Sequence, residues 1–424
     1  MTRMFVHTAD VHLGFQKKEG LIRLEREIFD NMMAWCVKQE VDFILMAGDL
    51  FHTNIPDMGV QKHAFAAFER VRAANIPVYA VYGSHDASPV HNSVIDLLAE
   101  GGLLTNVHAP EVLEDGRIRL GFTTDPGTGI KIAGLPGLKA GREEGYFNML
   151  DKEALEAEAG PKIFMFHGGF TELTEGHKGD SMPLSLLPAG FDYYAGGHIH
   201  ETIRSKYGDA PVVYPGPPFA GYHADLELNA GGMQRGHMIV RHENGKVNDV
   251  AGSASRPKVE YLVIKVDADG RAPQDVDKEL MGRAADADAD GKVVIMRVSG
   301  TLSEGRVADI NLNGAVNLLN AQGAVAVELN RRSLLSKKYE IQTVAQKGSS
   351  RKEIERAVFA KHIKEYKGRP ELMGEEGIKM MSTMFKALSQ QKHEGETKAD
   401  YEKRVIDPAV ATLMAHADEA EKTA

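Results

Sequence analysis

The stretch Met46-Ala47-Gly48-Asp49-Leu50-Phe51-His52 decides how the rest of the chain folds. It closes a short, mostly apolar run at residues 41–46 that predicts a buried parallel strand. The run stops at Gly48-Asp49, which leaves one carboxylate at the carboxyl end of a strand, where open α/β sheets place their active sites. A single Gly-Asp pair is weak evidence, so the other predicted strand ends decide its meaning.

The residues around this stretch alternate between predicted strands and helices. A strand at 5–9 is followed by Asp10-Val11-His12, and a third strand at 77–82 ends in Gly83-Ser84-His85-Asp86. Apolar residues spaced three or four apart predict helices between these strands, at about 21–36 and 57–74, and another at about 92–100. This order predicts right-handed crossovers and a parallel sheet.

Further along the chain, shorter strands end in histidines. A strand at 162–166 precedes His167, and a strand at 191–195 precedes Gly197-His198-Ile199-His200. Asn244-Gly245 predicts a two-residue hairpin turn between two more strands.

The last 170 or so residues read as separate modules. Residues 252–257 predict a linker, and strands and helices then alternate between 259 and 329 as a small α/β unit. From about 350 the pattern is helical, and the last helix is expected to be interrupted at Pro408.

Composition limits the class of protein. A chain of 424 residues predicts two or three domains. It has no run of eighteen apolar residues, which argues against a membrane segment, and its single cysteine fits a reducing cytosolic compartment. The net charge of −10 argues mildly against a protein that coats nucleic acid through a basic surface.

The five strand ends together predict a metal centre. Mixed carboxylate and imidazole ligands suit Mn²⁺, Fe²⁺ or Zn²⁺ better than Ca²⁺ or Mg²⁺ alone. We expect Asp-x-His and His-x-His to be extended, so that both side chains project from one side, and glycine beside the ligands to permit close approach. Seven or eight ligands suit two ions that share a bridging carboxylate, for which Asp49 is the candidate.

These five motifs resemble those of the calcineurin-like metallophosphoesterases: Asp-x-His, Gly-Asp, Gly-Asn-His-Asp/Glu, His and Gly-His-x-His. Four stretches resemble one branch closely, the double-strand-break repair nucleases of the Mre-eleven and SbcD type. These are residues 9–14, residues 47–52, Gly197-His198-Ile199-His200 and Val213-Tyr214-Pro215-Gly216.

The resemblance implies an architecture. The expected fold is α/β: a calcineurin-like metallophosphoesterase β-sandwich flanked by helices, a small α/β capping domain and a C-terminal helical tail. The domains would span residues 1–252 (nuclease), 258–335 (DNA capping) and 345–424 (ATPase-partner binding). The family also implies a homodimer, with the helices at 57–74 and 92–100 as candidate contacts.

The resemblance also implies a function: an Mn²⁺-dependent nuclease acting as exonuclease on double-stranded DNA and endonuclease on single strands. Two Mn²⁺ ions are expected, with Mg²⁺, Fe²⁺ or Zn²⁺ as alternatives. The partners would be DNA and a coiled-coil ABC-type ATPase of the Rad-fifty or SbcC type, with no membrane. In a prokaryote the location would be cytoplasmic and nucleoid-associated.

Residue roles follow from the same resemblance. The first metal would be held by Asp10, His12, Asp49 and His200, and the second by Asp49, Ser84, His167 and His198. The catalytic histidines would be His85, at the leaving group or scissile phosphate, and His52, which would orient that phosphate. Ser84 departs from the family, which has asparagine there. A serine hydroxyl is a shorter and poorer ligand than an amide oxygen, so a weaker second site is expected.

Two other functions remain open from the sequence. One is a DNA-end-binding scaffold with a weakened metal centre, suggested by Ser84. The other is a phosphodiesterase for a small cyclic or linear substrate, which the added α/β and helical modules disfavour.

Overall fold

A computed structural model describes residues 3–87, 93–138, 142–174, 181–219, 222–233, 235–254, 259–336, 353, 355–356, 358–360, 363, 374–391, 393 and 396–423. The chain divides into two compact units, Met1–Leu335 and Ser336–Ala424. The predicted domain boundaries inside and between these units stay predictions. No helix among the described residues is long and apolar enough to cross a membrane.

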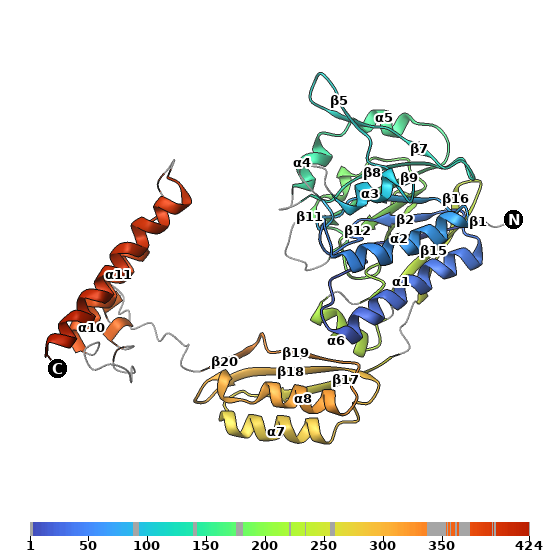
Figure 1. Cartoon of the computed structure of the whole chain (residues 1–424). Coiled ribbons are helices and arrows are strands. Elements are labelled where there is room, and N and C mark those ends of the chain that lie inside the picture. The colour runs from blue at the N-terminus through green and yellow to red at the C-terminus, as the bar shows by residue number, and fades with distance from the viewer. Residues whose placement is uncertain are drawn as a thin grey trace. The chain divides into compact units, whose positions relative to one another are not determined.

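Two six-stranded sheets face each other in the first unit (Figure 1). The first has the order β16 (Lys246–Ala254), β15 (Gly236–Glu243), β1 (Arg3–Thr8), β2 (Ile44–Ala47), β3 (Val78–Val81), β4 (Thr105–Asn106). The second has the order β13 (Ile203–Tyr207), β14 (Ala210–Tyr214), β12 (Tyr193–Gly197), β9 (Lys162–His167), β8 (Lys131–Leu135), β7 (Thr123–Thr124). The central strands of both sheets are parallel, and for the first sheet this confirms the prediction from the sequence.

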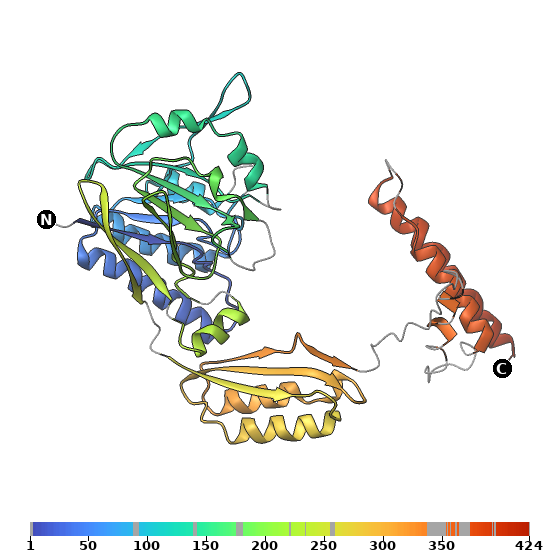
Figure 2. The same ribbon diagram turned by 180° about the vertical axis from the view of Figure 1, so that it is seen from behind.

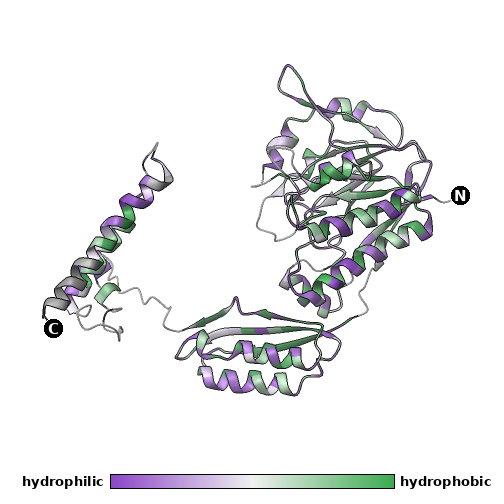
Figure 3. Ribbon diagram, in the orientation of Figure 1, coloured by the Kyte–Doolittle hydropathy of each residue, from purple (hydrophilic) through white to green (hydrophobic). Residues whose placement is uncertain are grey.

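Helices cover both outer faces of the sandwich. The core between the sheets contains side chains such as Phe43, Met165 and Tyr193. The outer face of the first sheet packs against α1 (Glu19–Gln39), α2 (Met58–Ala73) and α3 (Val94–Glu100). Shorter segments on the second sheet are α4 (Glu143–Asn148), α5 (Lys152–Ala157) and η1 (Leu184–Leu186), with the small pairs β5 (Pro110–Val112)/β6 (Ile118–Leu120) and β10 (Gly169–Phe170)/β11 (Ser181–Met182). Figure 3 shows hydrophobic and hydrophilic residues interleaved along α1 and α2, as expected for helices that bury one face.

The small α/β unit completes the first compact unit. Its strands are β17 (Glu260–Asp267), β18 (Lys292–Leu302) and β19 (Ala326–Asn330), which run parallel, and β20 (Leu334–Ser336), which pairs with β18. In both views α7 (Pro273–Ala285) and α8 (Leu312–Ala321) lie side by side on one face of this sheet (Figures 1 and 2). The remaining described segments of the first unit are η2 (Val307–Asp309) and α6 (His223–Ala230). Of the predicted linker, residues 252–254 belong to β16, and residues 255–257 lie outside the described residues.

The second unit is helical in its described part. It contains α10 (Gly374–Leu388) and α11 (Lys398–Thr423), which contact each other. The predicted interruption at Pro408 is wrong, because α11 continues through this residue. Proline removes one backbone donor, and this helix accommodates the loss without a break. Most of the helix predicted around residues 354–366 lies outside the described residues.

Candidate metal centre

The carboxyl ends of five strands, β1, β2, β3, β9 and β12, converge on one site. The loops that follow them are hydrogen bonded to one another. The Asp10 N–H donates to the Gly48 carbonyl at 3.1 Å, and the His198 N–H donates to the Asp10 carboxylate at 3.0 Å. The sandwich therefore brings together the five motifs predicted from the sequence.

Four residues of these loops have a left-handed backbone. Asp10, His12, Asp49 and His198 have φ of 55°, 49°, 50° and 94°, and they are four of only seven such non-glycine residues in the described part of the chain. Each such conformation costs an L-residue about 1–2 kcal/mol, so the surrounding structure must hold it, as is common at functional sites. The extended geometry expected for Asp10-x-His12 is therefore wrong: sharp turns, not strand alternation, aim these side chains.

Glycines allow the loops to approach closely, as expected. A Cβ on Gly83 would lie 2.0 Å from Asp49 Oδ1, and one on Gly48 would lie 2.3 Å from His167 Nδ1. Gly48 also has φ of +86°, which disfavours any larger residue. These two positions must be glycine if Asp49 and His167 are to stay in place.

Two overlapping clusters of ligand atoms form among the predicted metal ligands. One joins Asp10, His12 and His200, and the other joins Asp10, Asp49 and His167; within each cluster the ligand atoms lie within 4.8 Å of one another. Asp10 thus belongs to both. Asp49 Oδ2 lies 3.3 Å from His167 Nε2 and 3.7 Å from His12 Nε2, so it faces both clusters as well.

The spacing of these atoms fits metal coordination. The Nε2 atoms of His12 and His200 lie 3.3 Å apart. Two ligands at the bond lengths of a tetrahedral ion stand about 3.3–3.4 Å apart. His12 is 2 % exposed, and burial lowers its pKa to about 3 although Asp49 opposes this, so the ring is neutral, as a metal ligand must be.

The second cluster holds a proton that a cation would displace. Burial opposes charge on His167, but the Asp49 carboxylate outweighs it and raises the pKa of His167 to about 10. The same pairing keeps the pKa of Asp49 below its usual range against the effect of burial. Burial raises the pKa of Asp10 to about 6. Binding of a divalent cation here must release the His167 proton, so metal affinity should rise with pH.

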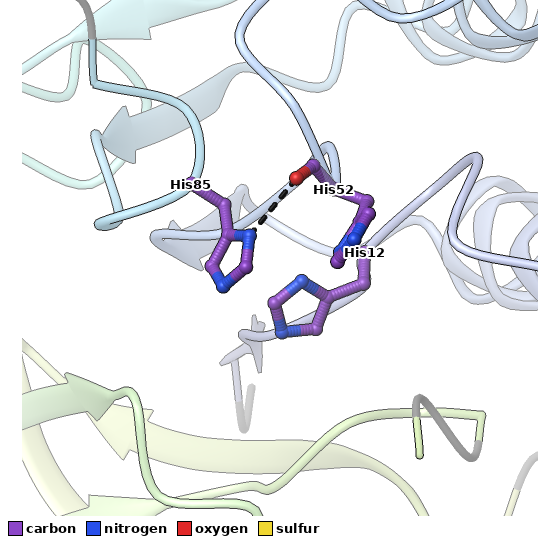
Figure 4. A group of neighbouring side chains, drawn as sticks. All are labelled: His12, His52 and His85. Atoms are coloured by element: carbon purple, nitrogen blue, oxygen red, sulfur yellow. Dashed lines mark hydrogen bonds between the residues drawn. The ribbon is translucent and has the colours of Figure 1, made fainter. Parts of the chain in front are cut away.

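The two predicted catalytic histidines lie beside the first cluster (Figure 4). The Nδ1 of His85 and the carbonyl of His52 are hydrogen bonded at 2.9 Å, and the rings lie 4.9 Å apart. Because a carbonyl only accepts, this bond places a proton on Nδ1 of His85 and leaves Nε2 for other partners. His12, His52 and His85 form a third group whose ring nitrogens lie within 4.8 Å of one another.

Two further predicted ligands, His198 and Ser84, are placed less directly. The ring of His198 lies 5.2 Å from that of His167, and its side chain is not in the three His/Asp groups formed by the described residues. Ser84 is next to His85, whose backbone N–H donates to Asp49 Oδ1 at 2.8 Å. Its side chain therefore starts beside the second cluster, but it is shorter than the family's asparagine.

The structure adds supporting residues to which sequence reasoning gave no role. The buried Asp86 carboxylate accepts hydrogen bonds from the N–H groups of Leu50 and Phe51 after β2 and of Gly83 after β3. Glu25 of α1 accepts from the N–H groups of the loop after β1, and burial raises the pKa of Glu25 to about 7. Asp86 lies in a recognised motif, whereas no sequence signal points to Glu25.

Comparisons with known proteins agree with this geometry. The calcineurin-like phosphoesterase family model matches residues 4–202. The DNA double-strand break repair protein Mre11 of Saccharolobus solfataricus is 27 % identical over 215 residues, covering 49 % of this chain and 52 % of the relative. That of Methanocaldococcus jannaschii is 30 % identical over 237 residues, covering 53 % and 58 %.

A third relative is the uncharacterized metallophosphoesterase YhaO of Bacillus subtilis, 27 % identical over 264 residues and covering 58 % of each chain. The chain thus matches little more than half the length of these curated relatives. The family match and the clustered aspartates and histidines both fall on the sandwich. Residues 4–202 form a domain of the calcineurin-like metallophosphoesterase family.

Proposed function

We propose that this chain is an Mn²⁺-dependent DNA nuclease of double-strand-break repair, acting as an exonuclease on double strands and an endonuclease on single strands. The observation that carries the proposal is the pair of ligand clusters that share Asp10 and face Asp49, with two histidines beside them. The similarity to Mre11 repair proteins supports DNA as the substrate.

Two cations would be held by the residues assigned from the sequence. Asp10, His12, Asp49 and His200 would bind the first, and Asp49, Ser84, His167 and His198 the second. Bound there, two divalent cations would activate water and neutralise charge on the phosphate. The clustered carboxylates would otherwise repel a phosphodiester, so metal binding and substrate binding should depend on each other.

His85 is the proposed proton donor to the leaving oxygen. Its Nδ1–H is held by the His52 carbonyl, so the ring is oriented and Nε2 is the atom that can carry a proton to substrate. Its backbone N–H holds Asp49, so the proposed acid and the proposed bridging ligand are positioned by one residue. His52, whose ring lies against that of His85, would orient the phosphate.

Exposed apolar residues support the proposed partners. Ile55 before α2, Met58 at the start of α2 and Leu97 within α3 are exposed, and a homodimer contact is proposed there. Phe385 and Leu388 of α10 are exposed in the helical unit. So are Ile406, Val410 and Leu413 of α11. A coiled-coil ABC-type ATPase would bind this unit, and the α/β unit would contact DNA, in a cytoplasmic, nucleoid-associated complex if the source is prokaryotic.

The test is degradation of end-labelled duplex DNA with Mn²⁺, comparing the chain with His85→Ala. Loss of a general acid should lower kcat by about 10²- to 10⁴-fold. His63→Ala is the matched control, because His63 pairs with Asp30 away from the metal centre. Salt-dependent DNA binding without cleavage by any version would favour the scaffold. Cleavage of a cyclic dinucleotide, with no DNA binding, would favour the small-molecule phosphodiesterase.

A further inference from the structure

A carboxylate accepts a hydrogen bond from the proposed metal ligand His200, on the side of the ring away from His12. Its Nδ1 donates to Asp225 Oδ2 at 3.1 Å, while its Nε2 faces His12. Asp225 is 5 % exposed and is the third residue of α6, where the same oxygen accepts the N–H of Tyr222 at 3.0 Å. A carboxylate on the second nitrogen fixes the tautomer and orientation of a ligating histidine.

A buried arginine ties this pair to the rest of α6. Arg235 is 6 % exposed and donates to three acceptors: Asp225 Oδ1 at 2.8 Å, the His200 carbonyl at 3.0 Å and Asn229 Oδ1 at 2.6 Å. Its fork therefore fixes His200 both through Asp225 and through the backbone. Asp225 and Asn229 lie one helical turn apart, so any movement of α6 moves both.

Helix α6 also contacts the α/β unit. Glu227 accepts from Arg297 of β18 and Asn330 of β19, each at 2.9 Å. The Asn229 Nδ2 donates to the Tyr261 hydroxyl of β17 at 3.4 Å. One continuous series of hydrogen bonds thus runs from Tyr261 through Asn229, Arg235 and Asp225 to His200.

An apolar contact surrounds this series. The face of the β17–β19 sheet opposite α7 and α8 packs on α1 and α6. The buried residues of this contact, from both sides, are Leu21, Leu24, Ile28, Phe219, Leu226, Val293, Ile295 and Ala326. At its edge, a Cβ on Gly20 would lie 1.8 Å from the Val325 carbonyl oxygen. The α/β unit is therefore seated by close packing, and displacing it would strain α6.

We propose that Asp225 and Arg235 are positioning residues for His200, and that α6 makes the affinity of the first metal site depend on how the α/β unit is seated. This rests on the proposed metal centre. A ligand or partner that shifts the α/β unit would then weaken or strengthen metal binding without touching a metal ligand.

The experiment is calorimetric titration of the metal-free full chain with Mn²⁺ alone, for the unmodified protein and two kinds of variant. Asp225→Ala breaks the support of His200 directly. Gly20→Ala and the pair Arg297→Met/Asn330→Ala disturb only the packing of the α/β unit against α1 and α6, and are called the seating variants. Lys292→Met is the matched control, because Lys292 also lies on β18 and forms an ion pair, with Asp288, away from α6. Circular dichroism checks that each variant is folded.

We expect Asp225→Ala to weaken one Mn²⁺ site by about 10- to 100-fold and the seating variants to weaken the same site by roughly 3- to 30-fold. The other site and the Lys292→Met protein should be unchanged. Unchanged affinity in the folded seating variants overturns the link to the α/β unit, and equal weakening of both sites overturns the specific role of His200. An unmodified chain that binds no Mn²⁺ overturns the proposed function and this inference together, whereas unchanged seating variants overturn only the inference.

Discussion

Asp86 Oδ1 accepts the backbone N–H of Phe51 at 2.8 Å, in a site where Asp86 is fully buried. With the Leu50 and Gly83 N–H groups bound to its other oxygen, this carboxylate joins the loop that presents Asp49 to the loop that presents His85. Burial, followed by the nearby Asp49 charge, raises the pKa of Asp86 to about 7.

Asp86→Ala should therefore destabilise the fold and loosen the metal centre. It leaves three buried N–H donors without this acceptor, at a cost of about 3 kcal/mol or more in the free energy of unfolding. Urea denaturation measures this. Asp115→Ala, which removes an exposed partner of Arg117, is the control and should change stability by under about 0.5 kcal/mol. Equal stability of the two variants would contradict the role given to Asp86.

Ser84→Asn should tighten the second metal site. The longer asparagine side chain should bring an amide oxygen to the cluster of Asp49 and His167, which the shorter serine hydroxyl reaches less well. An increase of roughly tenfold in Mn²⁺ affinity, equivalent to about 1.4 kcal/mol, is expected in calorimetry, together with a lower Mn²⁺ requirement for cleavage. An affinity that does not change would show that Ser84 is not a metal ligand and does not weaken the site.

Gly83→Ala should abolish activity. The added methyl would lie 2.0 Å from Asp49 Oδ1 and 2.2 Å from the Asp49 backbone nitrogen, so the proposed bridging ligand must move. Gly145→Ala is the control, because a Cβ there meets nothing within 4 Å. Metal content and cleavage rate, measured for both folded variants, should fall only in the first. Retained metal binding in Gly83→Ala would argue against Asp49 as a shared ligand.

Acid should destabilise the first unit through His237. This residue is 1 % exposed on β15, and burial lowers its pKa from 6.5 to about 4. Because the unfolded chain binds the proton more readily, the stability that the neutral ring provides is complete above pH 6.5 and is lost as the pH falls through 4. The loss amounts to about 3 kcal/mol.

The single tryptophan reports on this transition. Trp35 lies 5.1 Å from the His237 ring, so its fluorescence can follow denaturant unfolding at several pH values. His237→Phe should make the stability less dependent on pH between 6.5 and 4. A pH dependence identical to that of the unmodified chain would assign the acid sensitivity to other groups, such as buried His7.

The candidate metal centre shows where sequence reasoning was sufficient to bring the motifs together. Gly48-Asp49 and Gly197-His198-Ile199-His200 follow short apolar strands, and parallel strands in a sheet align their carboxyl ends. Convergence of these motifs could therefore be predicted without coordinates. Left-handed backbone at Asp10 and His12 could not, because such conformations are stabilised by hydrogen bonds from other loops and not by local preference.

The sequence by itself determined the alternating strands and helices, the candidate ligand residues and the need for glycine beside them, because these depend on local spacing and side-chain chemistry. Only the tertiary structure decided that Asp10 belongs to two clusters, that Asp86 and Glu25 hold the loops, and that Asp225 and Arg235 connect His200 to the α/β unit. Those roles arise from contacts between residues far apart in the chain. The physical reason is that burial and charge pairing act through distance in space, which no local pattern encodes.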